Sequence, residues 1–567
     1  MISFFNKIDL TPLAEGRLRR VARQLACAGM VGLTAACTGN DAGLGTEGYV
    51  KGFFGGVAGD EPRAVLEARK ILSSGGNAAD AATAMYFTLA VTMPSAASLG
   101  GGGTCLVYRP KFEREVSQKI EALQFLTGLP ARIPEAATRP SGVPGNSMGM
   151  FALHARYGTM PWREIVFVGE RLARFGTQVS RALLTDLGPV ENALLQDAES
   201  RRIFRGADGG PIKEGDIMRQ PDLANALSNI RANGPVDFYR GKFASLFVDR
   251  VRAAGGSLSL DDMRSYKPRW TKTISMEFGT LFNRSTAHFV PPPAVAGLVQ
   301  AQMLKMLNTG KIFGRANETE KYHLLAEVGL TAFAERARWM QQNFESKFPL
   351  KSLLDSSVTG TAMKNFSRDR HLSPKSFRPV PRPTPENPSA TSFVVVDRFG
   401  MAVTCAFTMN YIFGTGRIAK DTGIMIAAIP RGAGKGPMSL GPMMIVNEKS
   451  SQFLLAAAGA GGVTAPTAVA SVVARSYLDG QNLDTAMRAP RVHHSGAPDV
   501  TYHEPTLPQD TITALRKRGH RVAATPQIGL VNIAYCPGGL PRDPASCSLM
   551  NDPRGNGLTV NALTELE

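Results

Sequence analysis

Two adjacent hydroxyl side chains, Thr391 and Ser392, stand at the start of a strongly β-forming run that continues through residues 393–396. They follow a segment rich in proline, which cannot sustain helix or sheet hydrogen bonding, so an extended and exposed linker is predicted from about residue 360 to residue 388. A linker that ends abruptly at a buried strand is a place where the chain could be cut. The cut would leave a new N-terminus inside a sheet.

Other residues with chemical potential form weaker patterns. The glycine run 100–103 leads into a short strand, but neither a Lys-Ser/Thr pair nor a GxGxxG spacing follows. We therefore interpret the run as a structural turn rather than a phosphate site. His493 and His494 have no carboxylate arranged beside them for a metal, and no CxxC pair exists for structural zinc. The sequence predicts neither a metal nor a cofactor.

The cysteines divide into two kinds. Cys536 and Cys547 bracket a turn-rich loop and could close a short disulfide. Cys105 and Cys405 lie in apolar, strand-like runs, and we interpret them as small core residues.

The N-terminal segment is typical of a secretory signal. Four arginines between residues 17 and 23 precede an uncharged stretch, Leu25 to Ala36, which is too short to span a bilayer. Residues 33–37 resemble a bacterial lipobox, in which Cys37 is acylated; plain cleavage near Ala36 and a buried N-terminal helix are the alternatives. We expect a periplasmic or cell-envelope protein, anchored through Cys37 to the inner or outer membrane if it is acylated.

Length and composition exclude several classes of protein. The 567 residues are 43% hydrophobic and 20% charged, which excludes collagen, a coiled coil and a polytopic membrane protein. The net charge of +17 is spread along the whole chain, with no helix-turn-helix or aromatic-basic RNA motif. Nucleic-acid binding is therefore not predicted.

Helices and strands alternate along the body without a tandem repeat. Periodicity predicts helices over 61–74 and 78–92. A strand over 391–396, a turn at 397–400 and a second strand over 401–407 form a predicted hairpin.

Ten short motifs, in this order along one chain, carry a resemblance to a known family. The chain resembles the gamma-glutamyltransferases from Gly52 to about Leu558. The motifs are GGNAADAA (75–82), LGGGG (99–103), SGVPG (141–145), YGTMPW (157–162), NGPVDFYRG (233–241), GGSLSLDDMRSY (255–266), PPP (291–293), FGTG (413–416), APRVHH (489–494) and DPRG (552–555).

The resemblance implies an α+β fold, the αββα four-layer sandwich of N-terminal-nucleophile hydrolases. In that family the precursor cuts itself after the linker, and the freed threonine serves as nucleophile and as its own general base. The implied organisation is a signal segment (1–36), a short tether (37–51), a large-subunit-like region (52–359), a linker (360–390) and a small-subunit-like region (391–567). The two regions together would form one sandwich, and a processed chain would be a heterodimer of the two fragments.

The resemblance also assigns site positions in this sequence. An ungapped match anchored at Asp397 puts the place of the nucleophile at Ala390. The remaining positions are the supporting Thr408 and Asn410, the oxyanion glycines Gly461 and Gly462, Ser439 with Leu440 at a serine pair, Leu126 in place of an arginine, and Ala427 and Ala428 in place of polar residues that bind the glutamyl amine.

Two interpretations follow. In the first, Thr391 is the nucleophile of an autoprocessed amide hydrolase or acyl transferase for a small-molecule amide or gamma-glutamyl-like substrate. This needs a bulge, because side chains alternate faces along a strand; Ser389 is a further candidate that needs an equal shift. In the second, the protein is a non-catalytic relative that binds ligands or acts as an envelope scaffold. Loss of the charged residues makes glutathione a poor substrate in both cases.

Overall fold

The computed structural model describes residues 55–111, 119–279, 284–355, 359–360, 363–378, 390–430 and 436–560. Their core is a pair of antiparallel sheets. The first sheet has the order β20 (Leu558–Val560), β1 (Gly55–Gly59), β9 (Ala390–Asp397), β10 (Ala402–Thr408), β2 (Gly102–Arg109), β3 (Lys119–Phe125) and β6 (Arg269–Thr271). The second has the order β19 (Ser548–Met550), β18 (Leu530–Leu540), β14 (Gln452–Ala460), β13 (Met443–Asn447), β8 (Arg284–Phe289) and β7 (Ile274–Gly279).

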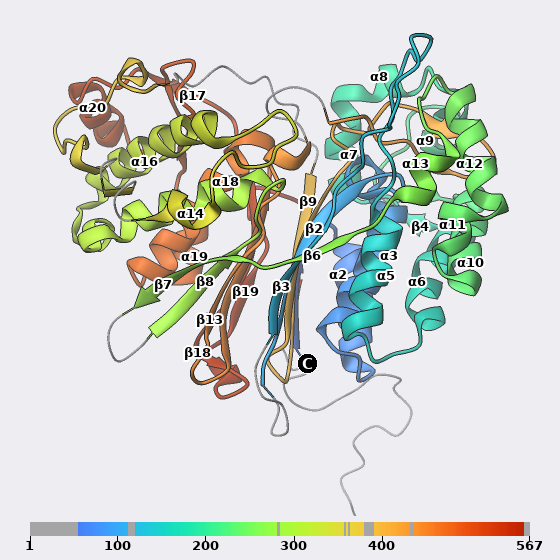
Figure 1. Ribbon diagram of the computed structural model, residues 1–567, viewed down its shortest axis with the longest axis horizontal. Coiled ribbons are helices and arrows are strands. Elements are labelled where there is room, and N and C mark those ends of the chain that lie inside the picture. Colours follow the sequence, from blue (N-terminus) through green and yellow to red (C-terminus); the bar gives the residue numbers. More distant parts are fainter. Residues whose placement is uncertain are drawn as a thin grey trace, which may run out of the picture. The chain divides into compact units, whose positions relative to one another are not determined.

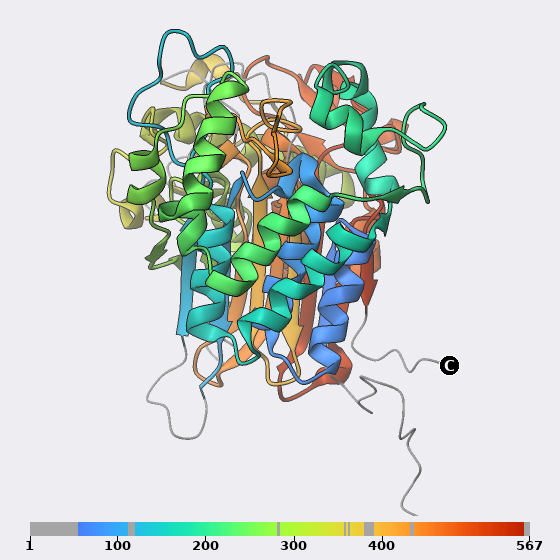
Figure 2. The ribbon, with the colours of Figure 1, turned by 90° about the vertical axis from the view of Figure 1, so that its right-hand side faces the viewer.

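Helices cover the outer face of each sheet, so the expected αββα sandwich is confirmed (Figure 1). The first sheet is covered by α2 (Pro62–Ser73), α3 (Ala78–Thr92), α5 (Asn146–Tyr157), α6 (Trp162–Phe175), α10 (Pro221–Asn233) and α12 (Lys242–Ala253), which lie in front of its strands in Figure 2. The second is covered by α14 (Val295–Asn308), α16 (Glu318–Trp339), α18 (Ala465–Val473) and α20 (Gln509–Lys517).

The strand β9 is buried on both faces, and its alternation divides its side chains between two cores. Phe393 and Val395 belong to the core under the helices of the first sheet. Val394 and Val396 belong to the core between the two sheets. A continuous apolar run such as residues 393–396 suits a strand with no solvent-facing side.

The predicted local elements agree with the structure. The hairpin is formed by β9 and β10, and α3 starts at a capping box in which the Asn77 side chain accepts from Asp80 N and the Asp80 side chain accepts from Asn77 N. These elements depend on local periodicity and capping, which the sequence displays directly.

Cys105 and Cys405 are core residues on strands, as predicted, but the disulfide between them was not predicted. They are directly opposite each other on β2 and β10 and form a disulfide within the core. Their separation of 300 residues hides this pairing from any local pattern. Cys536 and Cys547 form the short disulfide that was considered.

The expectation of an exposed linker holds only in part for residues 363–378: more than half of them are exposed, but others pack against the protein. Met363 and Phe366 pack against the core of the second sheet, and the His371 side chain is only 7% exposed. Most of the prolines, Ser389 and the segment containing Cys37 lie outside the described residues. Among the described helices, none has both the length and the apolarity needed to cross a membrane.

Candidate active site

The register of β9 against β10 fixes which side chains share a face. Ala390 is directly opposite Thr408, and Thr391 is directly opposite Phe407. Since opposite residues in an antiparallel pair project to the same side, Ala390 and Thr408 face the second sheet. Thr391 projects to the other side, toward the helices, with Phe407. The structure therefore does not bring Thr391 together with Thr408 and Asn410.

Thr391 is fully buried and already has a hydrogen-bond partner. Its Oγ1 donates to Asp60 Oδ2 at 3.0 Å, and the same oxygen accepts from Ser392 N at 2.8 Å. Asn532 Nδ2, from the second sheet, donates to Asp60 Oδ1 at 2.7 Å. Burial raises the pKa of Asp60 above its ordinary value, although these three hydrogen bonds oppose the shift. Asp60 thus fixes the start of β9 to the ends of β1 and β18.

On the face of the first sheet that carries Ala390 and Thr408, Asn410 makes hydrogen bonds to three neighbouring residues. Its Nδ2 donates to Thr127 Oγ1 at 2.8 Å and to Ala428 O at 2.6 Å, and its backbone N donates to Thr408 Oγ1 at 2.9 Å. Asn410 has a φ of 66°, a left-handed conformation that asparagine tolerates better than most residues. The structure therefore brings Thr408, Asn410 and Ala428 together, as the family pattern implies.

Gly461 and Gly462 follow β14 and lead into α18 through a single turn of 3₁₀ helix. The φ of 115° at Gly461 needs glycine, and a Cβ there would lie 2.7 Å from the Cα of Gly529; Gly462, with a φ of 63°, is in the left-handed region that glycine adopts most readily. Asn532 pairs with Ala458 on β14 and donates to Ser392 Oγ at 2.9 Å. The glycine pair therefore lies at the same end of the sandwich as the start of β9.

Leu126, which the resemblance puts in place of an arginine, lines a cavity of about 250 Å³. Its backbone oxygen accepts from Tyr266 Oη at 2.8 Å. The other residues lining this cavity are Gln124, Thr127, Leu129, Lys267, Arg269, Pro293, Asn343, Phe344, Pro430 and Pro437. Lys267 and Arg269 are exposed, whereas the buried lining includes the polar Gln124 and Thr127 together with Phe344, Pro430 and Pro437.

Three of the remaining predicted positions, Ala427, Ala428 and Ser439, take part in hydrogen bonds that hold the local backbone. Ala427 O accepts from Gly142 N at 3.0 Å, and Ala428 bridges to Ser141, so the SGVPG segment holds this stretch. Ser439 Oγ donates to Gly436 O at 3.0 Å within its own turn, and Leu440 is buried between the sheets.

Sequence reasoning missed three residues of this region, namely Asp60, Thr127 and Asn532. Asp60 is an acidic residue directly after an apolar strand, which is a visible signal. Its partner Thr391 is 331 residues away, so no local pattern could have connected them.

Comparison with known proteins gives the family. The family model described as "Gamma-glutamyltranspeptidase" matches residues 64–428 and 431–560. The chain is 29% identical over 506 residues to the "Glutathione hydrolase proenzyme" of Escherichia coli, covering 81% of this chain and 84% of that protein.

A second relative with the same name, from Pseudomonas aeruginosa, is 29% identical over 495 residues and covers 80% and 85% of the two chains. The solved structure of cephalosporin acylase from Bacillus halodurans has the same fold, with a TM-score of 0.75, 22% identity and coverage of 90% of this chain and 96% of that one. This chain belongs to the gamma-glutamyltranspeptidase family.

Proposed function

We propose that this chain is a ligand-binding family member of the cell envelope that does not carry out amide hydrolysis through a threonine at the start of β9. The observation that carries the proposal is the pairing of Ala390 with Thr408. The methyl group of Ala390 stands on the face that holds Thr408 and Asn410, and a methyl group has neither a lone pair nor a proton to transfer.

Thr391 does not replace the missing hydroxyl without a large rearrangement. Turning it toward Thr408 needs a one-residue slip or a bulge at the start of β9. That change would separate Thr391 Oγ1 and Ser392 N from Asp60 Oδ2. Each buried polar group left without a partner costs about 1–3 kcal/mol, so the observed arrangement is favoured.

The cavity beside Leu126 supports a ligand with an apolar acyl group. Leu126, Pro430 and Pro437 carry no charge, the cationic lining residues Lys267 and Arg269 are exposed, and no acidic residue is among the described lining, whereas a zwitterionic glutamyl group needs partners of both charges. Each hydrogen bond to a charged group contributes about 1.5–3 kcal/mol, so losing several weakens binding of glutathione by orders of magnitude. The proposed ligand is a small-molecule amide with a largely uncharged acyl part.

A second candidate function rests on the contact between Thr391 and Asp60. The hydroxyl donates at 3.0 Å to a carboxylate whose pKa is raised by burial, so a proton acceptor is already in place. On this basis the chain would be an autoprocessed amide hydrolase or acyl transferase, a heterodimer of two fragments, working on the side of the sheet opposite Thr408.

Reducing, denaturing electrophoresis with intact-mass measurement separates these two functions. We expect purified protein to give one species with no cut between residues 389 and 391, even after long incubation. A smaller fragment whose N-terminal sequence begins Thr-Ser-Phe in the wild type, but not in Thr391→Ala, would reject the binding proposal in favour of the hydrolase.

The envelope location is supported by the two disulfides, which persist in oxidising compartments. If Cys37 is acylated, the protein will partition into detergent, and Cys37→Ser will abolish this partition. Wild-type protein that stays in the aqueous phase would contradict the lipid anchor.

A further inference from the structure

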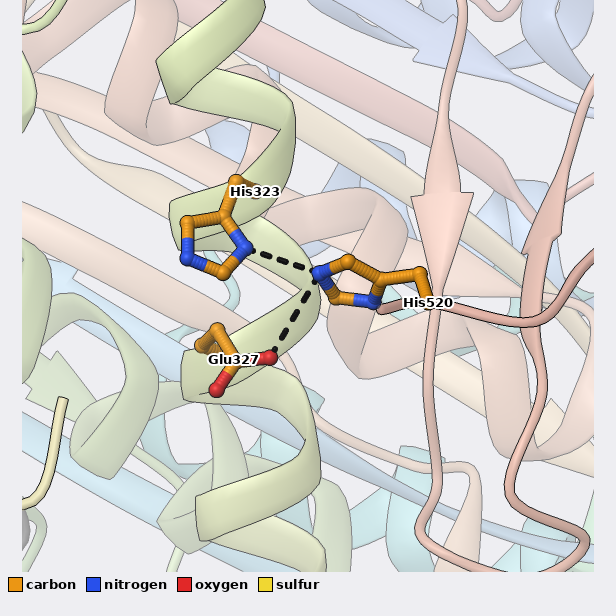
Figure 3. A group of neighbouring side chains, drawn as sticks. All are labelled: His323, Glu327 and His520. Atoms are coloured by element: carbon orange, nitrogen blue, oxygen red, sulfur yellow. Dashed lines mark hydrogen bonds and ion pairs between the residues drawn. The ribbon is translucent and has the colours of Figure 1, made fainter. Parts of the chain in front are cut away.

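Four of the eight histidines of this chain gather in one place, beside the helix α16 that covers the second sheet. His323 and Glu327 lie one turn apart on α16, and His520 follows α20. Figure 3 shows the side chains of these three residues directed toward one another. His371 and His494 lie beside them, with ring centroids 5.2 Å apart.

We propose that His323, Glu327 and His520 form a binding site for a divalent transition-metal ion, with Zn²⁺ as the best-fitting ion. His323 Nδ1 and His520 Nε2 are 2.8 Å apart, His520 Nε2 is 3.6 Å from Glu327 Oε1, and the three ligand atoms lie within 4.8 Å of one another. In a tetrahedral Zn²⁺ site with Zn–N bonds of about 2.0–2.1 Å, the nitrogens are roughly 3.3 Å apart. The two rings therefore need to separate by only about 0.5 Å.

The hydrogen bonds of the two histidines suit metal ligands. His323 Nε2 lies 2.8 Å from Ser367 O, which can only accept, so Nε2 carries the proton and the lone pair of Nδ1 points at the site. His520 Nδ1 lies 2.8 Å from Thr501 Oγ1, which can accept a proton from it and thereby free Nε2. Without metal, His520 Nε2–H donates to His323 Nδ1; when an ion binds, this proton moves to His520 Nδ1, which then donates to Thr501 Oγ1, and the ring stays neutral with no net loss of a proton.

The carboxylate is held in place by further partners. Glu327 Oε1 accepts from His371 Nδ1 at 2.6 Å, and Oε2 accepts from Leu372 N at 3.1 Å. Such outer hydrogen bonds orient ligands at metal sites. His371 Nε2 lies 3.0 Å from Asp499 Oδ1, so this ring bridges two carboxylates and is a positioning group rather than a ligand.

The neighbouring group of His371, His494 and Asp499 does not fit a metal as well. Gly496 N donates to His494 Nδ1 at 3.0 Å, which leaves the ring proton on Nε2. That nitrogen lies 3.2 Å from Asp499 Oδ1 and donates to it. Both ring nitrogens of His494 and both of His371 are occupied by these hydrogen bonds, so neither imidazole ring has a free lone pair for an ion.

The chemistry of the donor set selects the ion. Two imidazole nitrogens and one carboxylate oxygen are a zinc-type ligand set, whereas Ca²⁺ and Mg²⁺ prefer oxygen ligands. The three ligands are buried, and water would occupy the fourth position.

Metal analysis of the full-length chain tests the site. Protein stripped with a chelator is dialysed against ZnCl₂, and bound zinc is measured by mass spectrometry for the wild type, His323→Gln and Glu327→Gln. The matched control is His288→Gln, because His288 is a buried histidine whose Nε2 lies 3.1 Å from Glu448 but which has no second histidine beside it.

We expect the wild type and His288→Gln to bind one equivalent of Zn²⁺ more than His323→Gln and Glu327→Gln. Equal zinc in all four proteins, or none in the wild type, would overturn the proposal. If the site variants do not fold, the wild type decides: excess Zn²⁺ should raise its Tm by at least about 2 °C, and Co²⁺ should give the visible absorption of a four-coordinate site at one equivalent. Absence of both effects would also overturn it.

Discussion

Ala390 and Thr408 lie directly opposite each other on β9 and β10, on the face of the first sheet that meets the second sheet. A nucleophile that faces Thr408 would have to stand at position 390, which is alanine, and not at position 391, where the threonine is. The rest of the retained pattern, Asn410 with Gly461 and Gly462, lies at the same end of the sandwich as Ala390, which carries no hydroxyl group. Four predictions follow from this geometry and from the buried charges around it.

The variant Ala390→Thr restores a hydroxyl on the same face as Thr408. We expect this variant to cut itself before residue 390, because the supporting groups are already in place, and N-terminal sequencing of the small fragment will identify the cut. Thr391→Ala should behave like the uncut wild type, and adding Thr408→Ala to Ala390→Thr should slow cleavage. A folded Ala390→Thr protein that stays intact would mean that the retained residues are purely structural.

The variant Asp60→Ala removes the acceptor for Thr391 Oγ1, Ser392 N and the Asn532 amide. Leaving these buried donors without a partner costs about 1–3 kcal/mol each, partly offset by loss of a buried carboxylate. We expect the free energy of unfolding, measured by denaturant titration, to fall by about 3 kcal/mol. The exposed Asp208→Ala should not move the midpoint, and an equally stable Asp60→Ala would refute this role.

Asp397 gives a pH dependence with a defined sign. Burial raises its pKa to about 6, against 3.8 for the ordinary value, so its contribution to stability is full below about pH 4 and is lost as the pH rises through 6. The loss corresponds to about 3 kcal/mol. We expect Asp397→Asn to gain stability relative to the wild type between pH 4 and pH 7 by up to this amount, as seen in denaturation midpoints. A difference between the two proteins that is independent of pH would contradict the shift.

Arg491 and Asp552 form an ion pair at 2.7 Å, and each side chain is only 1% exposed. The Arg491 guanidinium also donates to Gly529 O, beside Gly461. Breaking a buried pair leaves an uncompensated charge, so Asp552→Ala should lower the free energy of unfolding by about 3–5 kcal/mol. Glu214→Ala, which breaks an exposed pair with Arg181, should cost less than about 1 kcal/mol in the same titration. Equal costs for the two variants would refute the prediction.

Local patterns predicted the helix caps and the β9–β10 hairpin, because both are encoded within short stretches. The αββα sandwich was implied by the resemblance carried by the ten motifs, which also assigned Thr408, Asn410 and the glycine pair as site positions. The sequence could not decide the face of Thr391, since this depends on the register of β9 between β1 and β10. It also could not reveal the contact with Asp60.

The histidine group shows the same limit. The spacing of His323 and Glu327 places both on one helix face, and this half of the group was readable from the sequence. His520 lies 197 residues after His323, and it meets His323 only once α16 and the segment after α20 pack together. His371 was missed because proline content made its segment look exposed.

The disulfide between Cys105 and Cys405 joins the part of the chain before residue 360 to the part after residue 390 by a covalent bond. If the polypeptide were severed anywhere in the linker, the two pieces would still migrate as one molecule until a thiol reagent released them. Electrophoresis without reductant would therefore report an unbroken chain whether or not processing had occurred.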